Sequence, residues 1–264
     1  MGKEEIGNES ILLESLPDLK RVHVFEEIDS TSDFAKQLKI GPDELPALIY
    51  ARRQTKGRGR GSKKWVSNDD SMTFSFLLDP TNLISPNHSS IVWGVALAAT
   101  LNEIADEGNP FQIKWPNDVM AHKSKVAGIL IESVLGDSAK QVVGIGINLQ
   151  NNSQQLEGES AAADIKAISV REVTGRRANS LELLRQLWFS FVRHSRFALT
   201  DLLNEYQKLD YLRSSTVQLQ VGDQVVCGEY RGVADDGSLQ ILVEGEMLQF
   251  QSASVLNVSW PSDD

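Results

Sequence analysis

The sequence predicts an α+β fold, in which a mixed β-sheet has helices on one face and a small β-rich domain follows it. β-rich segments recur between His23 and Leu149, and long helical stretches accompany them. After Ser214 the pattern changes to four short β-segments separated by glycine-containing turns, which is typical of a small barrel. We therefore expect a lead-in, a large domain and a small domain, with the bounds 1–20, 21–213 and 214–264.

The expected strands of the large domain are marked by alternating apolar residues or by β-branched and aromatic residues. They cover residues 23–28, 47–52, 72–78, 111–115, 125–134 and 141–149. The fourth strand ends at Pro116, which has no N–H group to donate to a sheet. Gly136-Asp137 separates the last two strands and predicts a hairpin.

The expected helices cover residues 33–38, 90–104 and 180–206, the last with a break near Arg196. Either Ser30 or Thr31 can cap the first helix, because each offers a side-chain oxygen to free backbone N–H groups. The small, polar residues of 151–167 predict a mobile loop. The four segments of the small domain cover 216–226, 228–234, 238–243 and 246–251.

Composition and charge restrict the function. The formal net charge of −10 argues against bulk nucleic-acid binding, which depends on neutralising phosphates. Cys227 is the one cysteine, so no disulfide can form within the chain, and the four histidines lack the spacing of metal ligands. We find neither a secretory signal nor an apolar span, and we expect a cytoplasmic protein with no membrane partner and no tightly bound metal.

A loop rich in glycine and basic residues runs from Arg53 to Trp65. Its alternating glycines let the backbone approach a ligand closely, and Arg58 and Arg60 bring planar forks that suit phosphate or carboxylate. In an acidic chain, this concentration of positive charge indicates an anionic ligand. The loop has no Walker A pattern, and a solvated turn or a nucleic-acid contact is the alternative explanation.

The segment Lys114-Trp-Pro-Asn-Asp118 is the second candidate. Asn117 and Asp118 stand where a strand ends, and a carboxamide beside a carboxylate can hold a ribose hydroxyl or a hydrated Mg²⁺, or can simply form a turn. Lys125 begins the next strand, and the apolar run behind it would fix its stem. It is therefore either a bridge between two anions or a solvated charge at a strand end.

The third candidate is the segment Gly144-Ile-Gly-Ile-Asn148. Glycines at alternate positions of a strand remove side chains from one face of the sheet. Either a ligand lies flat against that face, or the strand is tightly packed or bulged there.

Together these segments resemble the biotin protein ligase family. The resemblance rests on Ser30-Thr31, Gln54, GRGR at 57–60 with Trp65, KWPND at 114–118, KVAGIL at 125–130 and GIGIN at 144–148. Their order and spacing are similar to those of the family's catalytic domain over about residues 20–210. The resemblance implies a catalytic sheet like that of class II aminoacyl-tRNA synthetases, followed by an SH3-like C-terminal domain.

The resemblance also implies a reaction in two steps. The carboxylate of biotin attacks the α-phosphate of ATP, with Mg²⁺ present, and gives biotinyl-5′-AMP and pyrophosphate. A lysine of a biotin carboxyl carrier protein or domain, part of a biotin-dependent carboxylase, then attacks the mixed anhydride and releases AMP. Positioning and electrostatic stabilisation can supply most of this catalysis without a covalent enzyme intermediate.

Residue roles follow from the same resemblance. Lys125 and Arg58 are the expected catalytic cations. The residues expected to bind biotin are Ser30, Thr31, Ser32, Gln54, Arg58, Gly59, Arg60, Lys125, Gly128 and Gly144. The residues expected to bind ATP or the adenylate are Arg58, Arg60, Trp65, Asn117, Asp118, Lys125 and Asn148, with Asp118 also a candidate for Mg²⁺. Gly146, together with Gly128 and Gly144, is expected to let the ligand lie against the sheet.

The sequence departs from the family pattern in places. Ser32 stands where the family often has asparagine, and Gly61-Ser62 stands where some members have arginine and glycine. Only 29 residues precede Ser30, which is too few for the DNA-binding domain of bifunctional members, so we expect a ligase without repressor function and without a nucleic-acid partner. Family members often dimerise, and we expect a monomer or a homodimer.

Three alternatives stand beside this interpretation. A lipoate or octanoate ligase or transferase would share the catalytic fold, but an acyl chain does not need the polar partners that a ureido ring needs. A nucleic-acid-binding protein could use the arginine–glycine loop, against which the net charge of −10 weighs. A binding module without catalysis would be expected to lack charged residues that are present here.

Overall fold

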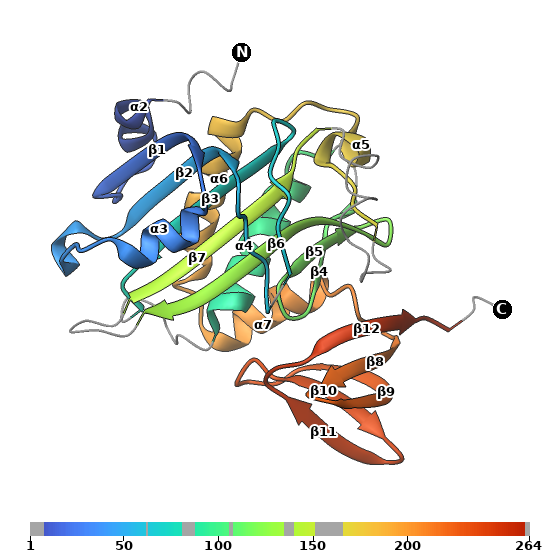
Figure 1. Ribbon diagram of the computed structural model, residues 1–264. Helices are drawn as coiled ribbons and strands as arrows, with labels where there is room; N and C mark the ends of the chain where they lie inside the picture. The colour runs from blue at the N-terminus through green and yellow to red at the C-terminus, as the bar shows by residue number, and fades with distance from the viewer. Residues whose placement is uncertain are drawn as a thin grey trace.

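The computed structural model describes residues 8–61, 63–80, 88–105, 108–134, 140–150 and 166–261 (Figure 1). The strands of the large sheet are β1 (Arg21–Ile28), β2 (Ala47–Gln54), β3 (Ser71–Leu78), β4 (Gln112–Lys114), β5 (Asp118–Ala121), β6 (Ser124–Val134) and β7 (Lys140–Asn148). Their order across the sheet is β1-β2-β3-β7-β6-β5-β4. β1 and β2 are parallel, and the other neighbours pair antiparallel. The predicted mixed sheet is confirmed.

Three helices cover one face of this sheet: α4 (Ser89–Asn102), α6 (Ser180–His194) and α7 (Leu199–Lys208) (Figure 1). α4 is buried almost all round, because Trp93 stacks on Phe191 of α6 at a centroid distance of 3.9 Å and on Phe76 of β3 at 5.2 Å. The predicted break near Arg196 is confirmed, since α6 ends at His194 and α7 begins at Leu199.

The opposite face of the sheet carries the short helix α3 (Thr31–Gln37), so the helices are not confined to one face. Ala35 of α3 packs in a second apolar cluster with Ile49 of β2 and Leu77 of β3. Ser30 is the N-cap, and its Oγ accepts a hydrogen bond from the Asp33 N–H at 3.3 Å. This cap fixes where the chain turns from β1 into α3.

The expected lead-in contributes to the main core. Within it, helix α2 (Glu9–Ser15) places Leu12 in the core, and Leu16 follows, each 0% exposed. The Trp188 indole of α6 donates to the Pro17 carbonyl at 2.7 Å. A helix of seven residues gives too little periodicity to be recognised in a sequence.

Five strands form the C-terminal sheet within the described residues: β8 (Thr216–Val221), β9 (Gln224–Val233), β10 (Leu239–Val243), β11 (Glu246–Phe250) and β12 (Ser254–Ser259). They are antiparallel, in the order β11-β10-β9-β8-β12. The sequence predicted four segments and missed β12, which completes the sheet beside β8. It also missed β5, whose turn to β6 uses His122 and Lys123 at positive φ instead of the usual glycine.

Two expected features lie outside the described residues. These are the Gly136-Asp137 turn between β6 and β7, and most of the loop expected over 151–167. A short helix, α5 (Val170–Thr174), follows that stretch. In the part of the chain that the structure describes, no helix combines the length and the apolar character that crossing a membrane requires.

Asp210 joins the two sheets where the chain passes from one to the other. It lies beside Ile113 of β4, and its Oδ2 accepts a hydrogen bond from the Tyr230 hydroxyl of β9 at 2.7 Å. Its Oδ1 accepts from the Leu212 N–H at 2.9 Å. Burial raises the pKa of Asp210 to about 6, because the hydrogen bonds only partly offset the loss of solvation.

The pH dependence of stability should report this buried carboxyl. Because the pKa of Asp210 is higher in the folded state than the ordinary value of 3.8, its contribution to stability is complete below that value and is lost as the pH rises through about 6. Between about pH 4.5 and pH 8, the wild type should lose about 2 kcal/mol of unfolding free energy relative to Asp210→Asn. Urea unfolding of both proteins at both pH values measures this difference, and an equal difference at the two pH values would contradict it.

Candidate active site

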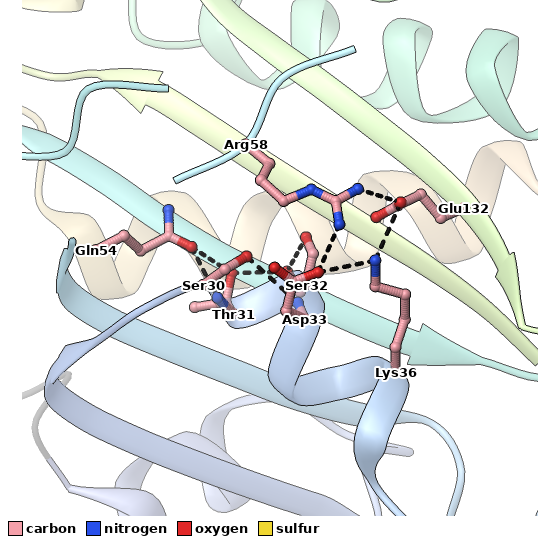
Figure 2. A network of polar contacts seen from close by, with 9 residues as sticks. Ser30, Thr31, Ser32, Asp33, Lys36, Gln54, Arg58 and Glu132 are labelled. Atoms are coloured by element: carbon pink, nitrogen blue, oxygen red, sulfur yellow. Dashed lines mark hydrogen bonds and ion pairs between the residues drawn. The ribbon is translucent and has the colours of Figure 1, made fainter. Parts of the chain in front are cut away.

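Several polar side chains meet where β1, β2 and β3 pass the start of α3 (Figure 2). Gln54 is the last residue of β2, and its Oε1 accepts hydrogen bonds from the Thr31 N–H at 2.7 Å and from the Thr31 hydroxyl at 3.1 Å. Ser75 of β3 lies 2.8 Å from the Thr31 hydroxyl and 3.0 Å from the Ser32 hydroxyl. We call Thr31, Ser32, Gln54 and Ser75 the polar cluster.

The polar cluster unites three of the residues expected to bind biotin, and it adds Ser75. Ser75 is 0% exposed and lies on β3 between Phe74 and Phe76, so its hydroxyl depends on these two partners. In the sequence, Ser75 is marked only as a serine within the predicted strand MTFSFLL. Ser30, in contrast, uses its side chain to cap α3.

The glycines of β6 and β7 make room for side chains on this face of the sheet. A Cβ atom at Gly144 would lie 2.4 Å from the Ser32 hydroxyl, and one at Gly146 would lie 2.3 Å from the Trp65 indole. A Cβ at Gly128 would lie 3.1 Å from the Lys125 Nζ and 3.4 Å from Trp65. We call these three glycines the glycine shelf.

In the structure, the Trp65 and Ser32 side chains occupy the space over Gly146 and Gly144. Trp65 also holds an indole N–H that is buried without an acceptor among the described residues. A buried donor without a partner is costly, and an acceptor on a bound ligand would satisfy it.

The glycine–arginine loop (residues 57–65, of which Ser62 is not described) is a small hairpin. The Gly59 N–H donates to the Lys63 carbonyl at 2.8 Å, and the Trp65 N–H donates to the Gly57 carbonyl at 3.0 Å. A Cβ at Gly57 would lie 2.4 Å from the Trp65 carbonyl oxygen, so only glycine lets the two arms come this close.

The two arginines of this loop point to protein groups. The Arg58 guanidinium contacts Asp33 and Glu132, and the Arg60 guanidinium donates to the Ala253 carbonyl at 2.7 Å and to the Ser252 hydroxyl at 2.6 Å. Arg58 and Arg60, which were expected to hold ligand anions, are thus bound to groups of the protein itself. The reason is tertiary, because carboxylates and the turn between β11 and β12 lie within reach of the loop.

Lys114 reaches the neighbouring strand β12 and was not assigned a role from the sequence. Its side chain is buried, and its Nζ donates to the Val255 carbonyl at 3.3 Å. Burial lowers the pKa of Lys114 to about 8, with Asp118 opposing the shift and Lys125 and Lys63 adding to it. The C-terminal sheet therefore lies against two cations next to the candidate site.

Lys125 and Asp118 form an ion pair on neighbouring strands. Lys125 Nζ lies 2.6 Å from Asp118 Oδ1, and it stands 5.9 Å from the centroid of the Trp65 ring. The Asn148 amide donates to the Lys125 carbonyl at 3.2 Å, so Asn148 supports the backbone of Lys125. Asn117 likewise supports the strands, because its amide donates to the Ile129 carbonyl at 2.8 Å.

These contacts do not make a metal site. Among the residues that the structure describes, no three or more histidine, cysteine, aspartate or glutamate side chains gather as metal ligands would. Asp118 offers one carboxylate, which Lys125 already neutralises. One carboxylate that is already paired with a lysine is not the ligand set of a resident metal.

The family model described as the biotin/lipoate A/B protein ligase family matches residues 24–149, which contain the polar cluster, the glycine–arginine loop, the glycine shelf and Lys125. Over these residues, just under half of the chain, the protein is similar to this family. Two curated proteins are similar to most of this chain. The bifunctional ligase/repressor BirA of Escherichia coli (strain K12) is 29% identical over 234 residues, covering 85% of this chain and 70% of that protein. The biotin–[acetyl-CoA-carboxylase] ligase of Paracoccus denitrificans is 28% identical over 217 residues, covering 80% and 90%.

A solved structure agrees with these matches. The biotin protein ligase of Aquifex aeolicus in complex with biotin and ATP superimposes with a TM-score of 0.75 at 27% identity. The match covers 92% of this chain and 100% of the Aquifex chain. Both sheets of the present chain are thus part of an arrangement that recurs in a relative.

Proposed function

We propose that this protein attaches biotin to a lysine of a carrier protein, using ATP. The observation that carries the proposal is that the polar cluster, the Trp65 indole and the Lys125 ammonium lie one after another along one face of the sheet, beside Gly144, Gly146 and Gly128. Gly144 and Gly146 are two residues apart on β7, which is roughly 7 Å at 3.3–3.4 Å per residue. The row therefore offers polar partners at one end, an aromatic face in the middle and a cation at the other end, which suits an elongated acid with a polar head.

In the first step, an oxygen of the biotin carboxylate attacks the α-phosphorus of ATP, an acyl phosphate bond forms, and pyrophosphate leaves. Lys125 would bridge the carboxylate and the α-phosphate, two anions that otherwise repel each other. Asp118 holds the Lys125 ammonium in place at 2.6 Å until phosphate oxygens compete for it. Mg²⁺ accompanying ATP would supply further neutralisation of the phosphates.

In the second step, the neutral amine of the carrier lysine attacks the acyl carbon, an amide bond forms, the acyl C–O bond breaks so that AMP leaves with the oxygen, and the nitrogen loses a proton to solvent. No nucleophile of the enzyme is needed. The work of the protein is to hold the adenylate and to exclude water from the anhydride until the carrier arrives. The Trp65 indole, with its free N–H, would pack beside the adenylate.

The direct test uses biotin, ATP, Mg²⁺ and a biotin carboxyl carrier domain. The carrier should gain the mass of one biotinyl group (biotin less one water), and its lysine-to-arginine variant should gain nothing. Lipoate and octanoate replace biotin in parallel reactions, because the family includes lipoate ligases. A folded enzyme that acylates the carrier with octanoate or lipoate but not with biotin would overturn the proposal in favour of that alternative.

Arg58→Ala should let the adenylate escape from the enzyme. Without the Arg58 side chain, the glycine–arginine loop loses its contacts to α3 and β6, and a loosened loop retains its ligand less well. We expect dissociation of biotinyl-5′-AMP to be about tenfold faster, since the two partly exposed ion pairs of Arg58 each contribute about 0.5–1 kcal/mol. Rapid gel filtration of enzyme loaded with labelled adenylate measures the retention, and retention equal to the wild type would contradict this expectation.

A further inference from the structure

Two carboxylates from distant parts of the chain hold the Arg58 side chain (Figure 2). Arg58 Nη1 donates to Asp33 Oδ1 at 2.6 Å, and Arg58 Nη2 donates to Glu132 Oε1. Asp33 lies in the first turn of α3, and Glu132 lies on β6 opposite Val142. Arg58 therefore ties the glycine–arginine loop to a helix and to a central strand at the same time.

Lys36 balances the charges of this network. Its Nζ lies 2.8 Å from Asp33 Oδ1 and 3.1 Å from Glu132 Oε1, so two cations alternate with two carboxylates. Burial alone would raise the pKa of Asp33, but Lys36 and Arg58 outweigh burial and leave the pKa lowered. Asp33 is thus ionised at neutral pH and remains a firm acceptor for Arg58.

The charged network of Arg58, Asp33, Glu132 and Lys36 lies directly beside the polar cluster. Asp33 directly follows Thr31 and Ser32 of the polar cluster, and Figure 2 shows the Arg58 side chain reaching from the loop across that helix turn toward Glu132. Trp65, at the other end of the loop, covers the glycine shelf. The Trp65 N–H is bonded to the Gly57 carbonyl, next to Arg58. Holding Arg58 in place therefore restrains both arms of the glycine–arginine loop over the polar cluster and the glycine shelf.

We propose that Asp33 and Glu132 are positioning residues that hold Arg58 and so keep the glycine–arginine loop closed over the polar cluster. The consequence for retention of an adenylate rests on the proposed function, whereas the closing of the loop does not. Arg58 then acts mainly by holding the loop in its closed position, and Lys125 is the cation that contacts the reacting carboxylate and phosphate. A guanidinium suits this task because its planar fork can meet two separate carboxylates.

The test is backbone amide exchange in the unliganded full-length protein, read at Gly59 and Trp65. These N–H groups donate the hydrogen bonds that close the loop hairpin. In Asp33→Asn and in Glu132→Gln, exchange at both amides should be about tenfold faster, because one charge-assisted contact is weakened. Amides of Val143 and Ile145 on β7 should be unchanged, which separates a loosened loop from a loosened fold.

Lys36→Met is the matched control. It removes the other cation from the same two carboxylates but leaves Arg58 attached, so exchange at Gly59 and Trp65 should stay within about twofold of the wild type. The proposal is overturned if Asp33→Asn and Glu132→Gln leave exchange at both amides unchanged, or if Lys36→Met accelerates it as much as they do.

A second readout connects the loop with the reaction. Glu132→Gln should release biotinyl-5′-AMP faster, and the double variant with Arg58→Ala should release it no faster than Arg58→Ala alone, because both changes open the same contact. Fully additive effects would contradict a shared contact. If the wild type forms no adenylate, the proposed function fails, but the exchange experiment still decides whether the carboxylates hold the loop.

Discussion

Lys125→Ala is expected to reduce biotin adenylation by about a thousandfold, which corresponds to about 4 kcal/mol of lost transition-state stabilisation. The ammonium would be the group that brings the two anions together, and the alanine side chain supplies no charge. The fold should survive, because the backbone bonds of Lys125 to Lys166 and Ile168 do not involve the side chain. Biotin-dependent exchange of labelled pyrophosphate into ATP, without carrier, measures the first step alone.

Two further variants sharpen this experiment. Lys208→Ala removes an exposed lysine whose ion-pair partner is Glu205 on α7, so it should retain full adenylation. Asp118→Asn removes the counter-ion of Lys125 and leaves the cation, so it should reduce adenylation less than Lys125→Ala does. Adenylation by Lys125→Ala within tenfold of the wild type would remove Lys125 from its role.

Gly146→Ala is expected to reduce adenylation by about a hundredfold, because the new methyl group would occupy the position of the Trp65 indole. The added Cβ would lie 2.3–2.8 Å from three atoms of the indole rings, which is closer than non-bonded carbon atoms approach. The indole must therefore leave the glycine shelf, and the face that would contact the adenylate leaves with it. The same exchange assay, run at increasing ATP concentration, would show the loss mainly in the KM for ATP.

Gly41→Ala is the matched control for this substitution. Gly41 has ordinary negative φ, and a Cβ placed there meets nothing within 4 Å. It should therefore leave adenylation unchanged. Wild-type adenylation and a wild-type KM in Gly146→Ala would mean that the position of Trp65 on the shelf does not matter for the reaction.

The contacts of the candidate site divide into those that a sequence pattern can indicate and those that it cannot. The glycine–arginine loop, KWPND and the alternating glycines stand out locally, and their combination indicated the family. Ser75, Asp33 and Glu132 carry no such mark, because a serine or an acidic residue at a strand or helix position is ordinary. Their importance arises from partners that are 25 to 74 positions away along the chain.

Arg60 illustrates the same limit. The resemblance placed Arg60 at the ligand, whereas the structure directs its guanidinium to Ser252 and Ala253, 192 and 193 positions away. No local pattern could indicate that the C-terminal sheet would present carbonyl groups at that point. The contact makes the C-terminal sheet part of the support for the loop.

The sequence by itself determined the elements with strong periodicity, the break between α6 and α7, the α+β class and the resemblance to the biotin protein ligases. These depend on interactions among near neighbours, which the order of residues specifies directly. Only the tertiary structure decided that Arg58 fastens the loop to two carboxylates, that Trp65 fills the space over Gly146, and that Lys125 is paired with Asp118. The physical reason is that each of these contacts joins residues on different strands, helices or loops. The order of the strands in the sheet decides which residues come together, and charged groups that are brought together must then be neutralised by a partner.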